Sequence, residues 1–219
     1  MLAGIIFDFD GVIVDSHPVH LQAWRAFFCS MGKKVKDEDL SFVLEGAKRD
    51  EILQHFLGGL TQEQIRTCGA EKERLFREHA SQVKMVRGFA DFLAEVEQAG
   101  LPIAVATSGS RKRVEYTLEN FRLLSRFRAI VTGEDVSKGK PDPALFHLAA
   151  RGLRVDAENI LVCEDAVSGV AAAKTAGMKC LAIAANGRGA KLKDAGANLV
   201  VEDFTRTNLN GVRKLFVQA

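Results

Sequence analysis

The stretch GIIFDFDGV, residues 4–12, joins a short apolar run to two carboxylates, Asp8 and Asp10, that are separated by one residue. A buried strand that ends in two acids needs a compensating group, because an unpaired buried carboxylate is costly. Oxygen ligands of this kind suit Mg²⁺, which commonly binds together with a phosphate. A polar turn that caps the following helix is the structural alternative. Because ligands bind beyond the carboxyl ends of parallel strands, we favour a magnesium and phosphate site here.

Further apolar runs along the chain resemble the one before Asp8, since they are short, rich in β-branched residues and bounded by polar residues or glycine. Stretches with a helical period separate them. This alternation predicts an α/β fold, with a Rossmann-like parallel sheet covered by helices on both faces. We expect the strand order 3-2-1-4-5-6, numbered along the chain. The expected strands are residues 4–7, 103–106, 129–131, 160–163, 181–184 and 199–201.

Residues 16–85 interrupt the alternation, because they contain helical patterns but no convincing strand. We predict a helical cap domain over residues 16–85, inserted into a core domain of residues 1–15 and 86–219. Within the cap, residues 19–31 have the pattern of an amphipathic helix. Thr61 and Gln64 have the spacing of a capping box, so a second long helix is expected to begin there.

Other polar clusters lie next to predicted strands or helices in the core. Taken singly, each has an ordinary explanation, since a hydroxyl before a helix is usually an N-cap and a loop lysine is usually solvated. Together with Asp8 and Asp10 they predict one site, with an acid pair, a phosphate cradle, a counter-cation and further metal ligands. The clusters are Thr107, Ser108 and Gly109 after the second strand, Lys140 before a helix, and Glu164 and Asp165 after the fourth strand.

These motifs resemble the haloacid dehalogenase-like phosphotransferase superfamily, and the resemblance extends over essentially the whole chain. The subgroup that contains β-phosphoglucomutase and small sugar-phosphate phosphatases is the most similar. The resemblance implies that Asp8 attacks phosphorus to give an aspartyl phosphate, while Asp10 protonates the leaving oxygen and later activates water. The matching residues are Asp8-Phe9-Asp10-Gly11-Val12, Thr107, Lys140 with Pro141, and Glu164-Asp165.

The resemblance also implies a cofactor. Mg²⁺ would be held by Asp8, the backbone carbonyl of Asp10 and Asp165, with Glu164 contributing directly or through water. Asp10 is expected to need a pKa high enough to hold a proton for the leaving group. Its presence disfavours dehalogenation, because a halide leaving group needs no proton.

The cap is predicted to select the substrate. Residues 44–50 resemble the substrate loop of β-phosphoglucomutase, including Arg49, but Glu45 stands where the mutase has a lysine. The reversed charge favours a phosphatase over a mutase. Lys48 is expected to be a solvated lysine at the start of a helix.

His20 lies one helical turn before Trp24, and it is expected to touch the substrate or the Asp10 loop. Trp24 either faces the same cleft or packs in the cap core. Ordinary surface or packing roles are expected for His17, and the basic run at residues 111–113 is expected to be a solvated face. The predicted substrate-binding residues are therefore His20, Glu45, Arg49, Ser108 and Gly109.

Composition limits the classes of partner. The 219 residues include 30 Lys and Arg against 28 Asp and Glu, and the formal charge of +2 gives no field that favours nucleic acid or membrane binding. The apolar start is interrupted by Asp8 before it reaches the length of a secretory signal, and no stretch approaches the ~20 apolar residues that span a bilayer. Four widely spaced cysteines indicate neither a zinc site nor a disulfide framework. We expect a cytoplasmic monomer.

The sequence thus predicts a Mg²⁺-dependent phosphomonoester phosphatase whose partner is a small phosphorylated metabolite, such as a sugar phosphate. A β-phosphoglucomutase-type hexose-phosphate mutase is the first alternative. A catalytically silent regulatory or binding module on the same fold is the second, and the intact set of Asp8, Asp10, Lys140 and Asp165 disfavours it.

Overall fold

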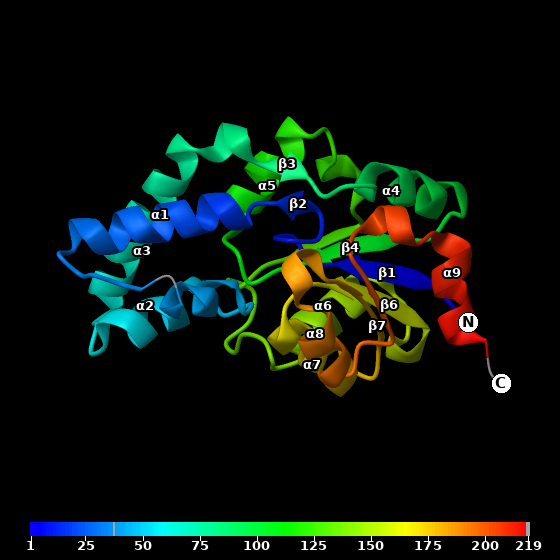
Figure 1. Ribbon diagram of the computed structural model, residues 1–219. Coiled ribbons are helices and arrows are strands. Elements are labelled where there is room, and N and C mark those ends of the chain that lie inside the picture. Colours follow the sequence, from blue (N-terminus) through cyan, green and yellow to red (C-terminus); the bar gives the residue numbers. More distant parts are fainter. Residues whose placement is uncertain (37, 218–219) are drawn as a thin grey trace.

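A six-stranded parallel sheet forms the centre of the computed structural model, which describes residues 1–36 and 38–217 (Figure 1). The order β5-β4-β1-β6-β7-β8 confirms the predicted order 3-2-1-4-5-6. Because neighbouring strands of this sheet are parallel, their carboxyl ends meet at one edge. The strands are β1 (Gly4–Phe7), β4 (Ile103–Ala106), β5 (Ala129–Val131), β6 (Ile160–Glu164), β7 (Lys179–Ile183) and β8 (Leu199–Val201).

The first strand lies inside the sheet and is buried on both faces. β1 pairs with β4 and with β6, which places Ile6 opposite Ala104 on one side and Val162 on the other. Alternate side chains of a strand point to opposite faces. Accordingly Ile5 and Phe7 belong to one hydrophobic cluster of the core, and Ile6 belongs to the other.

Helices cover both faces, as the α/β prediction requires (Figure 1). The face of Phe7 packs against α4 (Phe89–Gln98), α5 (Arg111–Asn120) and α9 (Leu209–Arg213). The opposite face packs against α6 (Ala144–Leu153), α7 (Val167–Thr175) and α8 (Gly189–Asp194). Short 3₁₀ helices connect several elements, at Asp39–Leu44, Ala80–Gln82, Leu124–Arg126, Ala157–Asn159, Ala185–Gly187, Phe204–Arg206 and Lys214–Phe216.

Three further helices form a separate layer beyond the carboxyl edge of the sheet, on the left in Figure 1. They are α1 (His17–Ser30), α2 (Arg49–Leu57) and α3 (Gln62–Glu78). Their shared core contains Trp24, Phe27, Phe28, Leu40, Ile52, Leu53, Phe56 and Ile65. A two-stranded antiparallel pairing of β2 (Val14–Asp15) with β3 (Lys84–Met85) lies where the chain enters and leaves this layer. The division into a core domain and a cap domain at residues 16–85 stays a prediction, and we use "cap" for this helical layer.

Local sequence signals explain where two helices of the cap begin. Thr61 accepts a hydrogen bond from the backbone N–H of Gln64, and the Gln64 side chain accepts one from the backbone N–H of Thr61 at 2.8 Å. The predicted capping box is therefore formed. The helix expected at residues 19–31 begins two residues earlier, because Pro18 is tolerated in the first turn of a helix.

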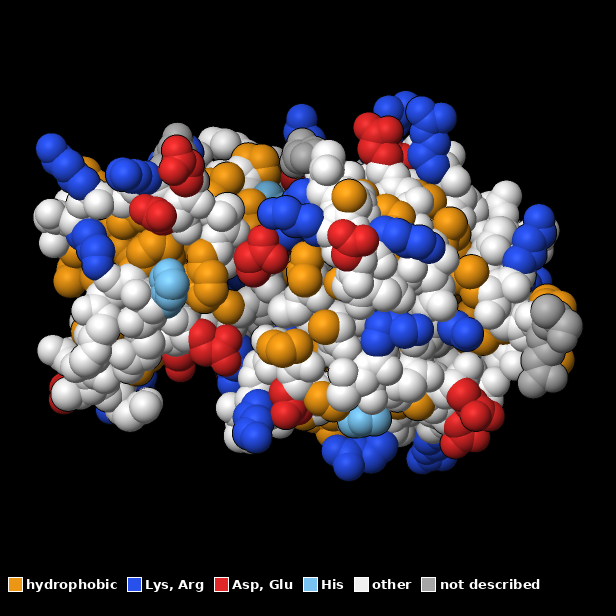
Figure 2. All heavy atoms as spheres, turned by 60° about the horizontal axis from the view of Figure 1, so that its bottom comes forward, with side chains coloured by type: hydrophobic (Ala, Val, Ile, Leu, Met, Phe, Trp, Pro, Cys, Tyr) orange, Lys and Arg blue, Asp and Glu red, His pale blue; other side chains and the backbone are white. Residues whose placement is uncertain are grey.

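On the face shown in Figure 2, basic and acidic side chains are interspersed, and a notch separates the lobe of α1 to α3 from the lobe that contains the sheet. Among the described residues, no helix is both long and apolar enough to cross a bilayer.

Phe7 is the last residue of β1, and its packing fixes the strand end directly before Asp8. Its ring lies 5.4 Å from that of Phe89 and 6.3 Å from that of Phe92, both nearly perpendicular to it, and 6.5 Å from Phe204. Such edge-to-face contacts are favourable in addition to the buried area. Asp8, the candidate nucleophile, therefore directly follows a fully buried residue whose ring contacts several other aromatic rings.

We expect Phe7→Ala to lower the free energy of unfolding by about 3–5 kcal/mol, because the substitution leaves a cavity in a packed core. Urea unfolding measures this as a lower midpoint at an unchanged m-value. Tyr116→Ala is the control, since this ring is 55% exposed and its removal should cost no more than about 0.5 kcal/mol. A loss below about 1 kcal/mol for Phe7→Ala would show that the core closes around the gap.

Candidate active site

A cavity of about 410 Å³ lies between the cap and the carboxyl edge of the sheet. Residues from both parts of the chain form its walls. The core contributes Asp8, Asp10, Thr107, Ser108, Gly109, Arg113, Lys140, Glu164 and Asp165, and the cap contributes His17, His20, Trp24, Lys48, Arg49, Lys72 and Glu73. Except for Glu45, the residues predicted from sequence for the site therefore meet at one place.

Lys140 is the central cation of this cavity. Its Nζ donates to Asp8 Oδ1 at 2.5 Å, to the backbone carbonyl of Ala106 at 3.3 Å, and to Glu164 Oε1. The side chain is 1% exposed. Burial alone would lower the pKa of Lys140, but Asp8 and Glu164 raise it above its ordinary value, so the ammonium stays charged.

Glu164 is held more tightly than Asp8. Its Oε2 accepts hydrogen bonds from the backbone N–H groups of Asp165 (2.8 Å) and Ala166 (2.9 Å), while Oε1 binds Lys140. By contrast, among the described residues no hydrogen bond reaches Asp8 Oδ2. Asp8 therefore keeps one carboxylate oxygen available at the cavity wall.

The acids outnumber the cation that contacts them. Burial raises the pKa of Asp8 to about 7, against the opposing effect of Lys140, and burial together with Glu164 raises the pKa of Asp165. In both cases burial disfavours the ionised carboxylate by more than the neighbouring cations favour it. The surplus of oxygen ligands suits a hard divalent cation such as Mg²⁺.

The carboxylates of this cavity fit Mg²⁺ better than they fit a metal ion whose ligands are all side chains. In the part of the chain that the structure describes, no group of three or more His, Cys, Asp or Glu side chains is arranged to hold a metal ion. Mg²⁺ commonly uses one or two carboxylates and takes its other ligands from water and phosphate. Asp8 and Asp165 would supply those carboxylates.

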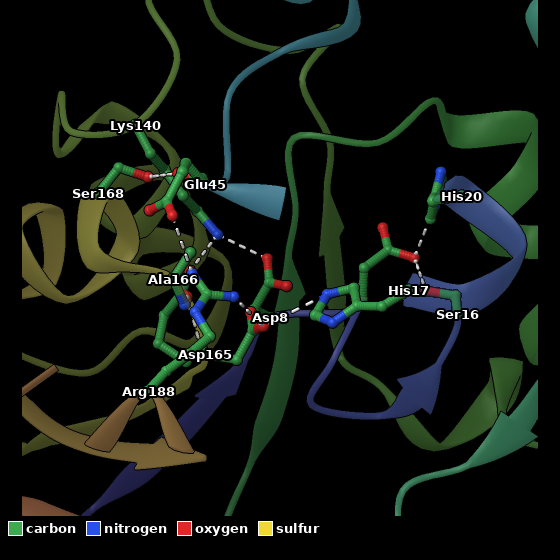
Figure 3. A network of polar contacts seen from close by, with 12 residues as sticks. Asp8, Ser16, His17, His20, Glu45, Lys140, Asp165, Ala166, Ser168 and Arg188 are labelled. Carbon is green, nitrogen blue, oxygen red and sulfur yellow. Dashed lines mark hydrogen bonds and ion pairs between the residues drawn. The ribbon is translucent and has the colours of Figure 1, made fainter. Parts of the chain in front are cut away.

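Asp165 also has two basic neighbours that sequence did not reveal. His17 Nε2 lies 3.3 Å from Asp165 Oδ2, and Arg188 lies 3.9 Å from the same oxygen. Figure 3 shows Asp8 between the Lys140 side of the network and the His17 side. The expectation of an ordinary role for His17 was wrong, because the start of α1 packs against the sheet edge and directs this ring into the cavity.

Asp10 accepts hydrogen bonds from three neighbours. Ser16 Oγ donates to Oδ1 at 2.5 Å, Arg113 donates to Oδ1 at 2.8 Å and to Oδ2 at 2.6 Å, and His20 Nε2 lies 3.3 Å from Oδ1. Burial would raise the pKa of Asp10, but Arg113 and His20 lower it well below its ordinary value. In this geometry Asp10 is an ionised acceptor, which differs from the expected proton-holding state.

Arg113 was missed at the sequence level, where residues 111–113 were expected to be solvated. Its side chain is 6% exposed and its guanidinium lies over the rings of Phe9 and Phe76. A signal was present, because Arg113 is in the first turn of α5, and helical side chains lean toward the helix N-terminus. That terminus is at the sheet edge, so a basic residue there reaches the site.

His20 joins Asp10 to α3. Its Nδ1 lies 2.9 Å from Lys72 Nζ, and its pKa is lowered to about 3 by burial and by Lys72. A neutral ring with the proton on Nε2 satisfies both contacts, since Nε2 then donates to Asp10 and Nδ1 accepts from Lys72. Burial lowers the pKa of Lys72 to about 8. Sequence predicted His20 at the cleft but gave no sign of Lys72.

The phosphate-cradle candidates lie at the end of β4. Thr107 is buried, and its Oγ1 accepts from the N–H of Gly109 at 3.1 Å. Ser108 is directed to the cap instead, where its Oγ donates to the carbonyl of Gly46 at 2.8 Å. Thr107 and Gly109 thus form a compact turn at the cavity wall.

The loop that contains Glu45 and Lys48 closes on the core. Ser168 Oγ donates to the Glu45 carbonyl, and Arg188 donates to the Glu45 side chain at 3.3 Å (Figure 3). Lys48 Nζ donates to the carbonyl of Val136 at 2.9 Å, so the expectation of a solvated lysine was wrong. Glu45 is not among the residues that line the cavity, and its role in substrate binding stays a prediction.

The chain is similar to known proteins over most of its length. A family model described as haloacid dehalogenase-like hydrolase matches residues 5–183. A phosphorylated carbohydrates phosphatase from Thermotoga maritima is 31% identical over 215 residues, covering 92% of this chain and 94% of that protein. A β-phosphoglucomutase from Bacillus subtilis is 30% identical over 220 residues, covering 95% of this chain and 92% of that protein.

A solved structure of CbbY from Rhodobacter sphaeroides in complex with phosphate has a TM-score of 0.85 at 27% identity, and the match covers 97% of this chain and 100% of that one. The chain also matches a much longer protein from Arabidopsis thaliana, SUPPRESSOR OF QUENCHING 1, of which it spans 20%.

The raised pKa of Asp8 predicts a pH-dependent stability in the absence of metal. Because this pKa rises from 3.8 in the unfolded chain to about 7 on folding, the folded protein binds more protons between about pH 4 and pH 7. Stability should therefore fall as the pH rises through this window. With a chelator present, the free energy of unfolding of the wild type should fall relative to that of Asp8→Asn between pH 4 and pH 8.

Asp15→Asn is the matched control, since it removes an exposed carboxylate outside the cavity. Urea unfolding at a series of pH values gives the comparison, and curves for the wild type and Asp8→Asn that stay parallel would contradict it. Added Mg²⁺ should reduce the difference at pH 8, because bound cation stabilises the ionised carboxylates.

Proposed function

This chain belongs to the haloacid dehalogenase-like hydrolases, and from that premise we propose that it is a Mg²⁺-dependent phosphatase of small phosphorylated metabolites that works through an aspartyl phosphate on Asp8. The observation that carries the proposal is the hydrogen bonding of the two carboxylate oxygens of Asp8. Lys140 fixes Oδ1 at the end of a rigid buried strand, and Oδ2 is left without a hydrogen bond from the described residues, at the wall of a cavity of about 410 Å³.

Asp8 is suited to attack phosphorus in line with the leaving oxygen. As the new P–O bond forms, the bond to the leaving oxygen breaks and the leaving group takes the electron pair and a proton. Lys140 and the turn of Thr107 and Gly109 lie at the same wall, where they can balance the charge of the phosphoryl oxygens. Mg²⁺, held by Asp8, Asp165 and the Asp10 carbonyl, would neutralise further charge on these oxygens.

Asp10 is proposed as the group that moves protons. In its present contacts it suits the second half-reaction, in which a carboxylate removes a proton from the water that attacks the aspartyl phosphate. Proton donation to the leaving oxygen requires that Asp10 exchanges its contacts with Arg113 for contacts with the substrate. Ser16 and His20 lie beside Oδ1, so the proposed exchange would occur next to the cap.

A hexose-phosphate mutase is the second candidate, supported by the similarity to β-phosphoglucomutase of Bacillus subtilis. The two reactions share the core chemistry and differ in whether water or a sugar hydroxyl accepts the phosphoryl group. Glu45 favours the phosphatase. A lysine here would bring a second cation to Arg188, whereas Glu45 accepts a hydrogen bond from it.

The substitution Asp10→Asn should separate the two half-reactions. An aryl phosphate has a leaving group that needs little protonation, so it should still phosphorylate Asp8, while water attack should slow by roughly 10²–10⁴-fold because general base catalysis is lost. Rapid quenching and mass spectrometry should then find phosphorylated protein that carries the phosphoryl group on Asp8. Asp8→Asn is the control and should give no phosphorylated protein and no turnover. Turnover at the wild-type rate by either variant would refute the proposed mechanism.

The choice between phosphatase and mutase can be measured directly. With Mg²⁺, the wild type should release inorganic phosphate from sugar phosphates and should show no sustained conversion of β-glucose 1-phosphate to glucose 6-phosphate in a coupled dehydrogenase assay, even when primed with a bisphosphate. A chelator should abolish phosphate release. Rapid isomerisation would place the mutase first, and full activity in the chelator would exclude the metal assignment.

A further inference from the structure

A glycine in the middle of α3 has no backbone reason to be there. Gly69 lies in the interior of this 17-residue helix and is buried. It is not among the glycines with positive φ, so alanine fits its backbone conformation. Glycine destabilises a helix interior relative to alanine, and a glycine there usually has a packing reason.

The space beside Gly69 is filled by Arg49. A Cβ atom at position 69 would lie 2.6 Å from Arg49 Nε and 2.7 Å from Cζ, and the third nearest atom, at 3.1 Å, is also in the guanidinium. These distances are well below the ~3.5–4.0 Å of an ordinary contact. The guanidinium of Arg49 therefore lies directly against the α3 backbone.

Arg49 is restrained from a second direction. It is the first residue of α2, and its Nε and one terminal nitrogen lie 3.3 and 3.2 Å from Asp50 Oδ1. The side chain is 34% exposed, and Arg49 lines the cavity. Asp50 thus holds one edge of the guanidinium while Gly69 supports it.

Gly69 also lies on the cavity side of α3. Residues three and four positions apart share a face of a helix, and Lys72 and Glu73, which follow Gly69 by three and four, both line the cavity. The helices α2 and α3 lie side by side (Figure 1). Gly69 itself is not among the residues that line the cavity, so it supports from behind the Arg49 side chain, which does line it.

We propose that Gly69 is a positioning residue that seats the Arg49 guanidinium at the cap wall of the cavity and thereby sets the preference for phosphates whose leaving group is large enough to reach Arg49. The inference rests on the proposed phosphatase function and deepens it. A side chain at position 69 would displace the Arg49 guanidinium by on the order of 1 Å. The guanidinium would move away from the α3 backbone and out of its hydrogen bonds with Asp50. The transferred phosphoryl group, which binds at the core, stays in place.

The test compares two substrates of different size in Gly69→Ala. One is the sugar phosphate that the wild type hydrolyses fastest, and the other is acetyl phosphate, whose leaving group is small. We expect KM for the sugar phosphate to rise roughly threefold or more relative to KM for acetyl phosphate, since a displacement of about 1 Å weakens a positioned contact. The melting temperature should stay constant or rise by a few degrees, because alanine favours the helix.

Thr67→Ala is the matched control, because it also replaces a poor helix former by alanine on α3 but at an exposed position. It should leave the ratio of the two KM values unchanged. A double-mutant cycle with Arg49→Ala tests the route of the effect. If Gly69 acts through Arg49, then Gly69→Ala should change nothing further in the Arg49→Ala background.

A structural readout makes the test independent of turnover. The Nε–H resonance of Arg49, identified by its loss in Arg49→Ala, should shift in Gly69→Ala and stay in place in Thr67→Ala. An unshifted resonance, an unchanged KM ratio, or an effect that persists without Arg49 would overturn the proposal. If Arg49→Ala raises KM for the sugar phosphate and Gly69→Ala does not, only this inference fails, whereas hydrolysis of neither substrate would refute the proposed function itself.

Discussion

The active edge of the sheet depends on one buried ammonium group. Lys140 binds Asp8 and Glu164 and reaches the end of β4 through the carbonyl of Ala106, so it connects the carboxyl ends of three strands. Its single charge does not balance the acids, as the raised pKa values of Asp8 and Asp165 indicate. That deficit suits the proposed phosphoryl transfer, since uncompensated carboxylates would favour a bound cation, and a cation would in turn attract a phosphate.

The cap completes the site by polar contacts with the core. Ser108 binds the carbonyl of Gly46, Lys48 binds the carbonyl of Val136, and Arg188 binds Glu45. All three contacts come from one cap loop, residues 45–48, and each reaches a different loop at the sheet edge, so they hold this loop against the rim of the cavity. Enclosure matters because charged groups interact more strongly once water is excluded. Surface ion pairs contribute little by themselves, and several contacts must therefore act together.

The sequence predicted the parts of the molecule that depend on local pattern. The strands, their order and the capping box at Thr61 follow from periodicity and from short-range rules, and the structure confirms them. The meeting of Asp8 and Asp165 also followed, because the carboxyl ends of parallel strands share an edge. Lys140 precedes a helix, and it was expected at the site from its combination with these acids and from the family resemblance. His17 and Arg113 were not predicted at the site. Both are on helices, where the direction of a side chain depends on how the helix packs, so the first-turn position of Arg113 was a signal that did not by itself decide whether the side chain reaches the site.

Asp10 is contacted by residues of both the core and the cap. Its backbone belongs to the loop that follows β1, yet its carboxylate receives Ser16 and His20 from the start of the cap and Arg113 from the core helix α5. Arg113 belongs to the core, whereas Ser16 and His20 belong to the segment that enters the cap. The cation from the core favours the ionised form of Asp10. The proton transfers proposed for Asp10 therefore depend on contacts from both parts of the chain, and all of these contacts meet at one carboxylate.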